Sequence, residues 1–139
     1  KQTSPTSPLG FKSKTDIWGA VDYPINPMKQ AIAAGATFVA RTTTYHVHQM
    51  TKIFREAILH DGFSVVEVLS QCPTYFGRKN RIGTAVDMME QYKNNTTPIG
   101  SKAKQENPDL IERGIFVQKE IPEYCREYDK IIARAMKGI

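Results

Sequence analysis

The pattern of hydrophobic and polar positions across residues 37–69 predicts a strand, a helix and a second strand. Residues 37–41 are short, β-branched or aromatic at their start and preceded by Gly35, which favours a buried strand. From Val47 the apolar residues recur every three or four positions, as on one face of a helix. The members of this stripe are Val47, Met50, Ile53, Phe54, Ala57 and Ile58. Residues 63–69 are nearly all apolar, which is typical of a strand covered on both faces.

Strand, helix and strand of these lengths form a right-handed βαβ crossover, so we expect an α/β fold with a mainly parallel sheet and flanking helices. Two further helices are expected before residue 93: one from Pro27 to Ala34, capped by Asn26, and one through Tyr92, capped by Asn80. The rest of the chain predicts an edge strand at 114–119 and a last helix that starts at Pro122.

The remaining stretches read as loops within a single domain that spans residues 1–139. Residues 1–26 are rich in Ser, Thr, Pro and Gly and predict an ordered or ligand-dependent loop, with a disordered leader as the alternative. Residues 27–93 then form an α-βαβ-α core. Residues 94–139 supply a polar connecting loop, the edge strand and the C-terminal helix.

Charge and hydropathy bear on whether the protein binds nucleic acid, other proteins or a membrane. The formal net charge is +5 and the pI is near 9.3, but the 19 Lys and Arg residues are scattered, and no nucleic-acid-binding signature is present. We therefore expect a solvated basic surface and no nucleic-acid partner, although a basic face for an acidic protein stays open. No apolar run approaches the roughly 20 residues that span a bilayer, and no signal-peptide core is present, so we expect a cytoplasmic protein without a membrane partner.

The two cysteines, Cys72 and Cys125, lie far apart and in no metal-binding spacing, so neither a disulfide nor a zinc site is expected. Cys72 follows the second predicted strand, where it is either a nucleophile or, as we prefer, a small buried hydrophobe.

The segment between the first strand and its helix, residues 42–48, carries three threonines and two histidines. On a strand, His46 and His48 would share one face and could bind a metal, but at the start of a helix they diverge. Since Val47 opens the helical pattern, we prefer the helix, with the threonines as caps. The strand end and the helix start would then form one wall of a site, where α/β sheets usually bind ligands.

Three segments, taken together and in order, resemble the β subunits of 2-oxoacid:ferredoxin oxidoreductases, and the closest branch is the 2-oxoglutarate:ferredoxin type. They are residues 2–10 (QTSPTSPLG), residues 33–41 (AAGATFVAR) with 43–46 (TTYH), and residues 62–78 (GFSVVEVLSQCPTYFGR). The resemblance covers nearly the whole chain. It implies part of a thiamine-diphosphate-binding fold and the oxidative decarboxylation of a 2-oxoacid with coenzyme A, which yields an acyl-CoA, CO2 and reduced ferredoxin.

The resemblance also implies site residues. Gln2, Thr3 and Ser4 match the family's stretch that closes over the cofactor diphosphate, and we expect them to bind the cofactor. The strand-end residues, Tyr45, His46, Cys72 and Thr74, are expected either to face the cofactor or a partner subunit or to serve in capping and packing. The family's GDGD motif, which holds Mg²⁺ and the diphosphate, lies upstream of this stretch. We therefore expect the chain to be the C-terminal half of the subunit.

Further expectations concern cofactors and partners. Two unpaired cysteines cannot hold a four-cysteine iron–sulfur cluster in this segment. The implied partners are the α subunit, the missing N-terminal half, ferredoxin, the 2-oxoacid and coenzyme A, in an oligomer, because a truncated sheet exposes an edge. The alternative is a non-catalytic assembly module of the same complex, inactive alone.

Overall fold

A four-stranded sheet organises the computed structural model, which describes residues 3–138. Its strands are β1 (Phe38–Thr43), β2 (Ser64–Leu69), β3 (Thr96–Pro98) and β4 (Ile111–Gln118), in the order β2-β1-β4-β3. β1 pairs with β2 and β3 pairs with β4 in parallel, whereas β1 and β4 are antiparallel. The predicted α/β fold with a mainly parallel sheet is confirmed.

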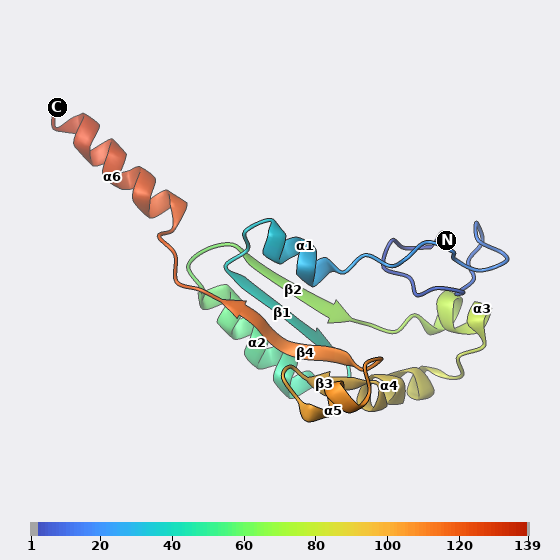
Figure 1. Cartoon of the computed structure of the whole chain (residues 1–139). Helices are drawn as coiled ribbons and strands as arrows, with labels where there is room; N and C mark the ends of the chain where they lie inside the picture. Colours follow the sequence, from blue (N-terminus) through green and yellow to red (C-terminus); the bar gives the residue numbers. More distant parts are fainter. Residues whose placement is uncertain (1–2, 139) are drawn as a thin grey trace.

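Helices cover the two faces of this sheet because alternate residues of each strand point to opposite sides. On one face, Met28 and Ala31 of α1 (Pro27–Ala33) pack with Val39 of β1. On the other face, Ile53 of α2 (Val47–Leu59) packs with Phe38 and Ala40. Figure 1 shows α1 and α2 on opposite sides of the strands.

The predicted strand–helix–strand unit is present as β1, α2 and β2, but its burial differs from the prediction. β2 lies at one edge of the sheet and is only half-buried along its length, so it is not a strand covered on both faces. In α2 only Ile53 is buried, and Val47, Phe54 and Ile58 of the predicted stripe are exposed. Within this chain the sheet therefore covers only part of the apolar surface of α2.

The third predicted strand is longer than expected and is not at the edge. β4 lies between β1 and β3, because the polar stretch that we took for a connecting loop contains the short strand β3, followed by α5 (Lys102–Glu106). The register between β1 and β4 shifts at Phe116, where a bulge places Phe116 and Val117 against the same core cluster beside α1. The edge-strand prediction was wrong.

The helix expected from Asn80 begins later. Pro73–Gly77 form a π-helical turn, η1, which continues into the short helix α3 (Arg78–Asn80). Arg81 then adopts a left-handed conformation with φ 54°, so the chain cannot continue as a helix. The next helix, α4 (Ala85–Asn94), is capped by Thr84 and not by Asn80.

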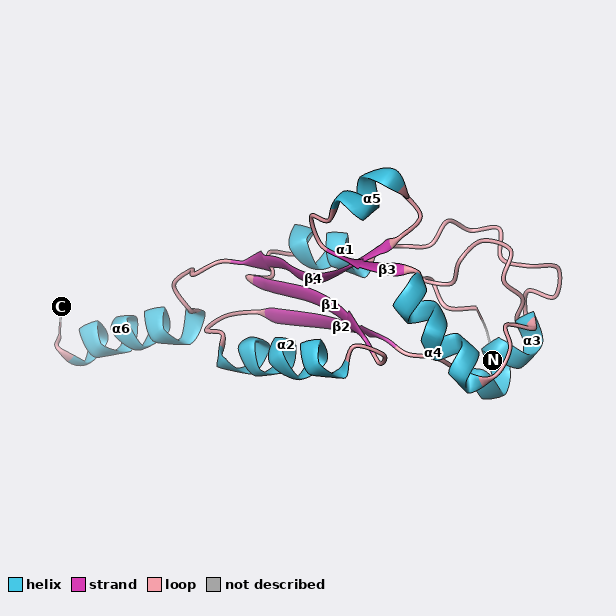
Figure 2. Cartoon of the chain, turned by 90° about the horizontal axis from the view of Figure 1, so that it is seen from below, coloured by secondary structure: helices cyan, strands magenta, loops and turns pink. Residues whose placement is uncertain are grey.

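The ends of the chain lie at opposite ends of the sheet. The N-terminal loop and α3 lie beyond the carboxyl ends of β1 and β2, whereas α6 (Tyr124–Met136) extends from the other end (Figure 1). Figure 2, turned by 90°, shows the same separation of α6 from α3 and α4. Across residues 3–138, every helix is too short or too polar to cross a membrane.

Candidate functional site

The carboxyl ends of β1 and β2 lie side by side because the two strands are parallel and in register, with Thr43 opposite Leu69. The backbone N–H of Thr44 donates to the carbonyl of Leu69 at 3.0 Å. Two residues beyond the end of β2, Oε1 of Gln71 accepts from the Thr44 hydroxyl at 2.7 Å. These bonds tie together the segments that follow the two strands, which are the segments predicted to form one wall of a site.

The threonines at the end of β1 and just after it do not cap α2, contrary to expectation. The N-cap position is taken by His46, whose side chain makes no capping bond. The Thr43 hydroxyl instead contacts Nδ1 of His46 at 2.8 Å, and Thr42 is fully buried. Among residues 3–138, Thr42 Oγ1 is the buried side-chain oxygen without a hydrogen-bond partner. Burial of these side chains inside the sheet removes them from the helix terminus.

His46 lies in an environment that disfavours its charged form. Partial burial, and then the positive charge of Arg113 on β4, lower the pKa of its imidazole. Tyr45 is exposed beside it, with its ring edge-on to the imidazole at a centroid distance of 5.0 Å. In the part of the chain that the structure describes, no group of three or more His, Cys, Asp or Glu residues could hold a metal ion.

Cys72 is exposed, so our preference for a small buried hydrophobe was wrong. It precedes η1, and the backbone N–H groups of Phe76 and Tyr75 lower the pKa of its thiol, with a smaller contribution from the Thr74 side chain. Thr74 is itself exposed within η1. The turn thus presents a thiol whose anion is stabilised by backbone donors.

The loop of residues 3–26 is ordered by hydrogen bonds among its own polar groups. The Thr3 hydroxyl donates to the Asp16 carboxylate, and the backbone N–H of Ser4 donates to Oγ of Ser7 at 3.0 Å. The Ser4 and Thr6 hydroxyls are 2.8 Å apart. Within the described part of the chain, the bonds of Thr3 and Ser4 stay inside this loop, and Gln2 lies outside the described residues.

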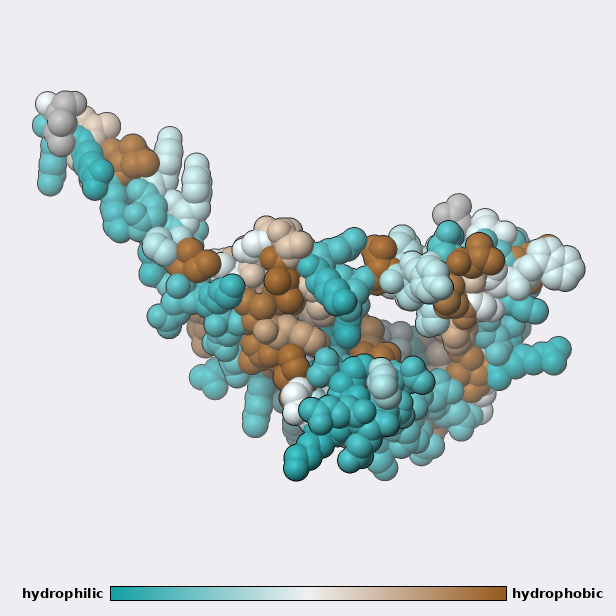
Figure 3. Space-filling model, viewed as in Figure 1, coloured by the Kyte–Doolittle hydropathy of each residue, from teal (hydrophilic) through white to brown (hydrophobic). Residues whose placement is uncertain are grey.

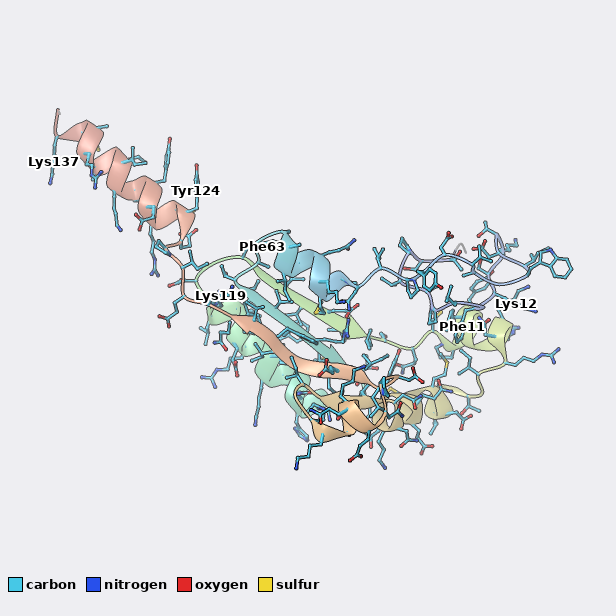
Figure 4. All side chains as sticks on the ribbon, in the orientation of Figure 1. Phe11, Lys12, Phe63, Lys119, Tyr124 and Lys137 are labelled. Atoms are coloured by element: carbon cyan, nitrogen blue, oxygen red, sulfur yellow. The ribbon has the colours of Figure 1, made fainter. Side chains whose placement is uncertain are left out.

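The loop is attached to η1 and α3, which are distant in sequence. The rings of Phe11 and Phe76 stack with centroids 4.9 Å apart. Next to them, the Asn80 side chain accepts from the backbone N–H of Lys12 at 2.7 Å and donates to the Lys12 carbonyl at 3.1 Å. Asn80 therefore fastens the loop and does not cap a helix. Figure 4 shows Phe11 and Lys12 beside this part of the chain.

A hollow of about 730 Å³ lies where the loop meets α3. Its lining includes the cationic side chains of Lys12, Lys79 and Arg81 and no acidic residue. This charge favours an anionic ligand such as a phosphate group. We did not predict this hollow from the sequence, although three cationic residues, Arg78, Lys79 and Arg81, lie within four positions of each other. Thr3 and Ser4 line a separate hollow, so the structure does not place them with the three cations.

Comparison with protein families gives a match over residues 1–68 to the family described as "Thiamine pyrophosphate enzyme, C-terminal TPP binding domain". The matched range contains the N-terminal loop, α1, β1 and α2 and nearly all of β2.

Curated relatives extend the match over nearly the whole chain. The chain is 38% identical over 136 residues to the 2-oxoglutarate synthase subunit KorB of Methanocaldococcus jannaschii, covering 96% of this chain and 50% of the relative. It is 40% identical over 130 residues to the subunit of the same name from Methanothermobacter thermautotrophicus, covering 91% and 45%. The chain therefore spans about half the length of the curated relatives it matches.

A solved structure shows the same fold. It is the 2-oxoglutarate:ferredoxin oxidoreductase from Magnetococcus marinus with 2-oxoglutarate, coenzyme A and succinyl-CoA bound, and it superposes with a TM-score of 0.79 at 23% identity, covering 96% of this chain and 47% of the other. The resemblance identified in the sequence is confirmed by these matches.

Proposed function

We propose that this chain functions as part of the β subunit of a thiamine-diphosphate-dependent 2-oxoacid:ferredoxin oxidoreductase that acts on 2-oxoglutarate. The observation that carries the proposal is the 38% identity over 136 residues to a 2-oxoglutarate synthase subunit. In the proposed reaction, 2-oxoglutarate is oxidatively decarboxylated with coenzyme A to succinyl-CoA and CO2, and ferredoxin accepts the two electrons. The α subunit and the rest of the β subunit are the proposed partners.

The hydroxyl-rich loop fits the cofactor's diphosphate. Thr3 and Ser4 carry hydroxyl groups that can donate to phosphate oxygens, and we assign them, with Gln2, to diphosphate binding. Thiamine diphosphate, when bound, supplies the carbon nucleophile and the electron sink for decarboxylation. The contribution of these residues is to orient the diphosphate. The Thr3 hydroxyl donates to the Asp16 carboxylate in the structure, so donation to a phosphate oxygen requires this single proton to change partner.

Among the described residues, no group of three or more His, Cys, Asp or Glu side chains is placed to hold a metal ion. We propose that Mg²⁺ is bound by residues of another part of the enzyme. The two thiols, Cys72 and Cys125, are both free, and four thiolates hold an ordinary iron–sulfur cluster. We therefore place the electron-carrying cluster outside residues 3–138.

The second candidate function is an assembly module without catalytic groups. The observation that favours it is the C-terminal helix α6, none of whose residues is buried, as expected of an element that contacts another chain. The two functions differ in one respect: substitution of the loop hydroxyls impairs turnover in the first and leaves it unchanged in the second.

The test is an assay of the complex that contains this chain and its partner polypeptides. We expect reduction of ferredoxin that depends on 2-oxoglutarate and coenzyme A. Thr3→Val should raise the thiamine diphosphate concentration for half-maximal activity by roughly tenfold, because one hydrogen bond to a charged group contributes about 1.5 kcal/mol or more. Thr15→Val is the control, since Thr15 is exposed in the same loop and bonds only Ser13.

Two results would overturn the proposal. One is a complex that reduces ferredoxin equally well without this chain. The other is an unchanged cofactor requirement in both Thr3→Val and Ser4→Ala, which would favour the assembly module. A preference for another 2-oxoacid would retain the reaction class and correct the substrate.

A further inference from the structure

The C-terminal helix α6 extends from the body and exposes an apolar face. Tyr124 is 75% exposed, Tyr128 50% and Ile131 56%. The space-filling view shows this helix reaching away from the other elements, with brown apolar residues among its polar ones (Figure 3). A helix of 13 residues is only marginally stable in water without tertiary packing, so α6 requires a covering partner.

The body does not cover this face. The polar side of α6 faces the body, where Arg126 forms an ion pair with Asp61 at 2.8 Å next to the C-terminal end of α2. Tyr124 points away from the sheet in Figure 4. The Tyr124 and Tyr128 rings stack on each other, with centroids 5.8 Å apart, and extend the exposed apolar surface.

The apolar residues have the spacing of a helix–helix seam. Tyr124, Tyr128, Ile131 and Ala135 recur at intervals of four, three and four residues, which places them along one line of the helix. One flank of this line carries Cys125 and Ile132, and the other carries Glu127 and Arg134. The charged flank thus holds one acidic and one basic residue, separated by two turns. Glu127 also forms an exposed ion pair with Lys130 within the helix at 2.6 Å, a contact of the kind that contributes little in water, so its carboxylate can exchange this partner for one on another chain.

We propose that α6 binds the α6 helix of a second copy of this chain as an antiparallel pair. A two-fold axis at the middle of the seam places Tyr128 opposite Ile131 of the second copy and Tyr124 opposite Ala135, so each large ring meets a smaller side chain. In the same register, Glu127 of each copy lies opposite Arg134 of the other. The apolar flanks meet as well, with Cys125 opposite Ile132.

The parallel arrangement lacks this complementarity. It stacks Tyr124 on Tyr124 and Tyr128 on Tyr128, and it places Glu127 beside the apolar Ile132 of the partner helix. In an antiparallel pair the two helix macrodipoles also point in opposite directions, which is electrostatically favourable. A basic amphipathic helix can also bind a membrane surface. An anionic membrane, however, would make no favourable contact with the acidic Glu127, and the spacing of Glu127 and Arg134 would have no role there.

The first test is the mass of the chain in solution by light scattering and sedimentation. We expect a dimer for the unmodified chain and a monomer for Ile131→Asp. Glu127→Arg and Arg134→Glu should each weaken the dimer by roughly tenfold, because each brings like charges together twice, and the double variant should restore it. Lys137→Glu is the control, since it changes the charge by the same amount outside the seam.

The second test is a disulfide between copies. In a Cys72→Ser background, Ile132→Cys introduces a thiol that the antiparallel register places opposite Cys125 of the other copy. Within one helix the two positions are about 10 Å apart along the axis, too far to be bridged, so any bond must join two chains. The control is Ala133→Cys, on the opposite side of the helix.

Specific crosslinking of Ile132→Cys with restoration in the charge-swapped double variant would support the proposal. It is overturned if the chain is monomeric, if the dimer survives Ile131→Asp, if both cysteine variants crosslink equally, or if α6 binds anionic vesicles as a monomer. Because these substitutions lie outside the core, circular dichroism should show an intact body in every variant.

Discussion

At the scale of single residues, Arg41 on β1 contacts both of the strands that pair with β1. It forms an ion pair with Glu67 on β2, and Nη1 donates to the carbonyl of Glu112 on β4 at 3.4 Å. Its guanidinium also lies 5.6 Å from the centre of the Phe116 ring. The Arg41 side chain is only 12% exposed, so the charge depends on these partners.

We predict that Glu67→Gln lowers the free energy of unfolding by about 1–3 kcal/mol, because it leaves a largely buried guanidinium without its counter-charge. Urea denaturation measures the change. Glu90→Gln on the exposed side of α4 is the control and should change stability by less than about 0.5 kcal/mol. Equal stability of Glu67→Gln and the unmodified chain would show that the pair contributes nothing.

The two thiols should differ in reactivity although both are exposed. Backbone N–H groups lower the pKa of Cys72, whereas hydrogen bonding and charge from Glu123 raise the pKa of Cys125. Since the thiolate is the reactive form, Cys72 should be alkylated by iodoacetamide faster than Cys125 at neutral pH, and the rate for Cys125 should rise only at higher pH. Peptide mass spectrometry measures both sites.

The matched variant for this prediction is Glu123→Gln. It should shift the rise in the alkylation rate of Cys125 to lower pH and leave the pH dependence of Cys72 alkylation unchanged. Equal rates for the two thiols at every pH would contradict it.

At the scale of elements, the separation of α3 from α4 depends on local backbone chemistry. Thr84 accepts from the backbone N–H of Asp87 at 3.2 Å, and the Asp87 carboxylate accepts from the backbone N–H of Thr84 at 2.6 Å. This capping box satisfies the first donors of α4 and holds the pKa of Asp87 below its usual value. The start of α4 is therefore fixed at Thr84.

We predict that Thr84→Ala lowers the free energy of unfolding by about 1 kcal/mol, the usual cost of a lost N-cap. The control is Thr51→Ala, which removes an exposed hydroxyl inside α2 and replaces Thr by a better helix former. Thermal and urea unfolding compare the two. A loss in Thr51→Ala as large as in Thr84→Ala would show that the capping box is not responsible.

The same element contacts η1 closely. A Cβ atom at Gly77 would lie 2.6 Å from Sδ of Met88, a buried residue of α4. A side chain at this position would require the Met88 side chain to move, so glycine here allows the close packing of Met88 against the turn that carries Cys72.

At the scale of the whole molecule, the loop of residues 3–26 and the strand ends lie at one end of the sheet, and α6 lies at the other (Figure 1). The proposed cofactor contacts and the proposed contact with a second copy are thus separated by the length of the sheet. Substitutions in α6 should therefore change the association of the chain without altering the loop.

We expect no measurable binding when this chain alone is titrated with thiamine diphosphate and Mg²⁺, because residues 1–139 do not contain the GDGD motif to which the family resemblance assigns the metal and the diphosphate. Isothermal titration calorimetry is the measurement. The complex with the partner polypeptides is the positive control, and a saturable signal from the chain alone would contradict the prediction.

The sequence by itself determined the elements whose signals are local. The helical spacing from Val47 placed α2 at Val47–Leu59, and the run of apolar residues after Gly62 placed β2. Asn26 caps α1 as expected, accepting from the backbone N–H groups of Met28 and Lys29. These features depend on residues within a few positions of each other, so they can be predicted from the local sequence.

Only the tertiary structure decided how those elements are arranged. Whether β4 is central or at an edge depends on pairing with β3, whose three residues carry no strong strand signal of their own. The position of Asn80 along the chain suits a helix cap, but its side chain bonds the backbone of Lys12, 68 residues away. Burial of Thr42 and exposure of Cys72 likewise follow from which surfaces meet. Such long-range contacts are set by the packing of the whole chain, which local periodicity does not encode.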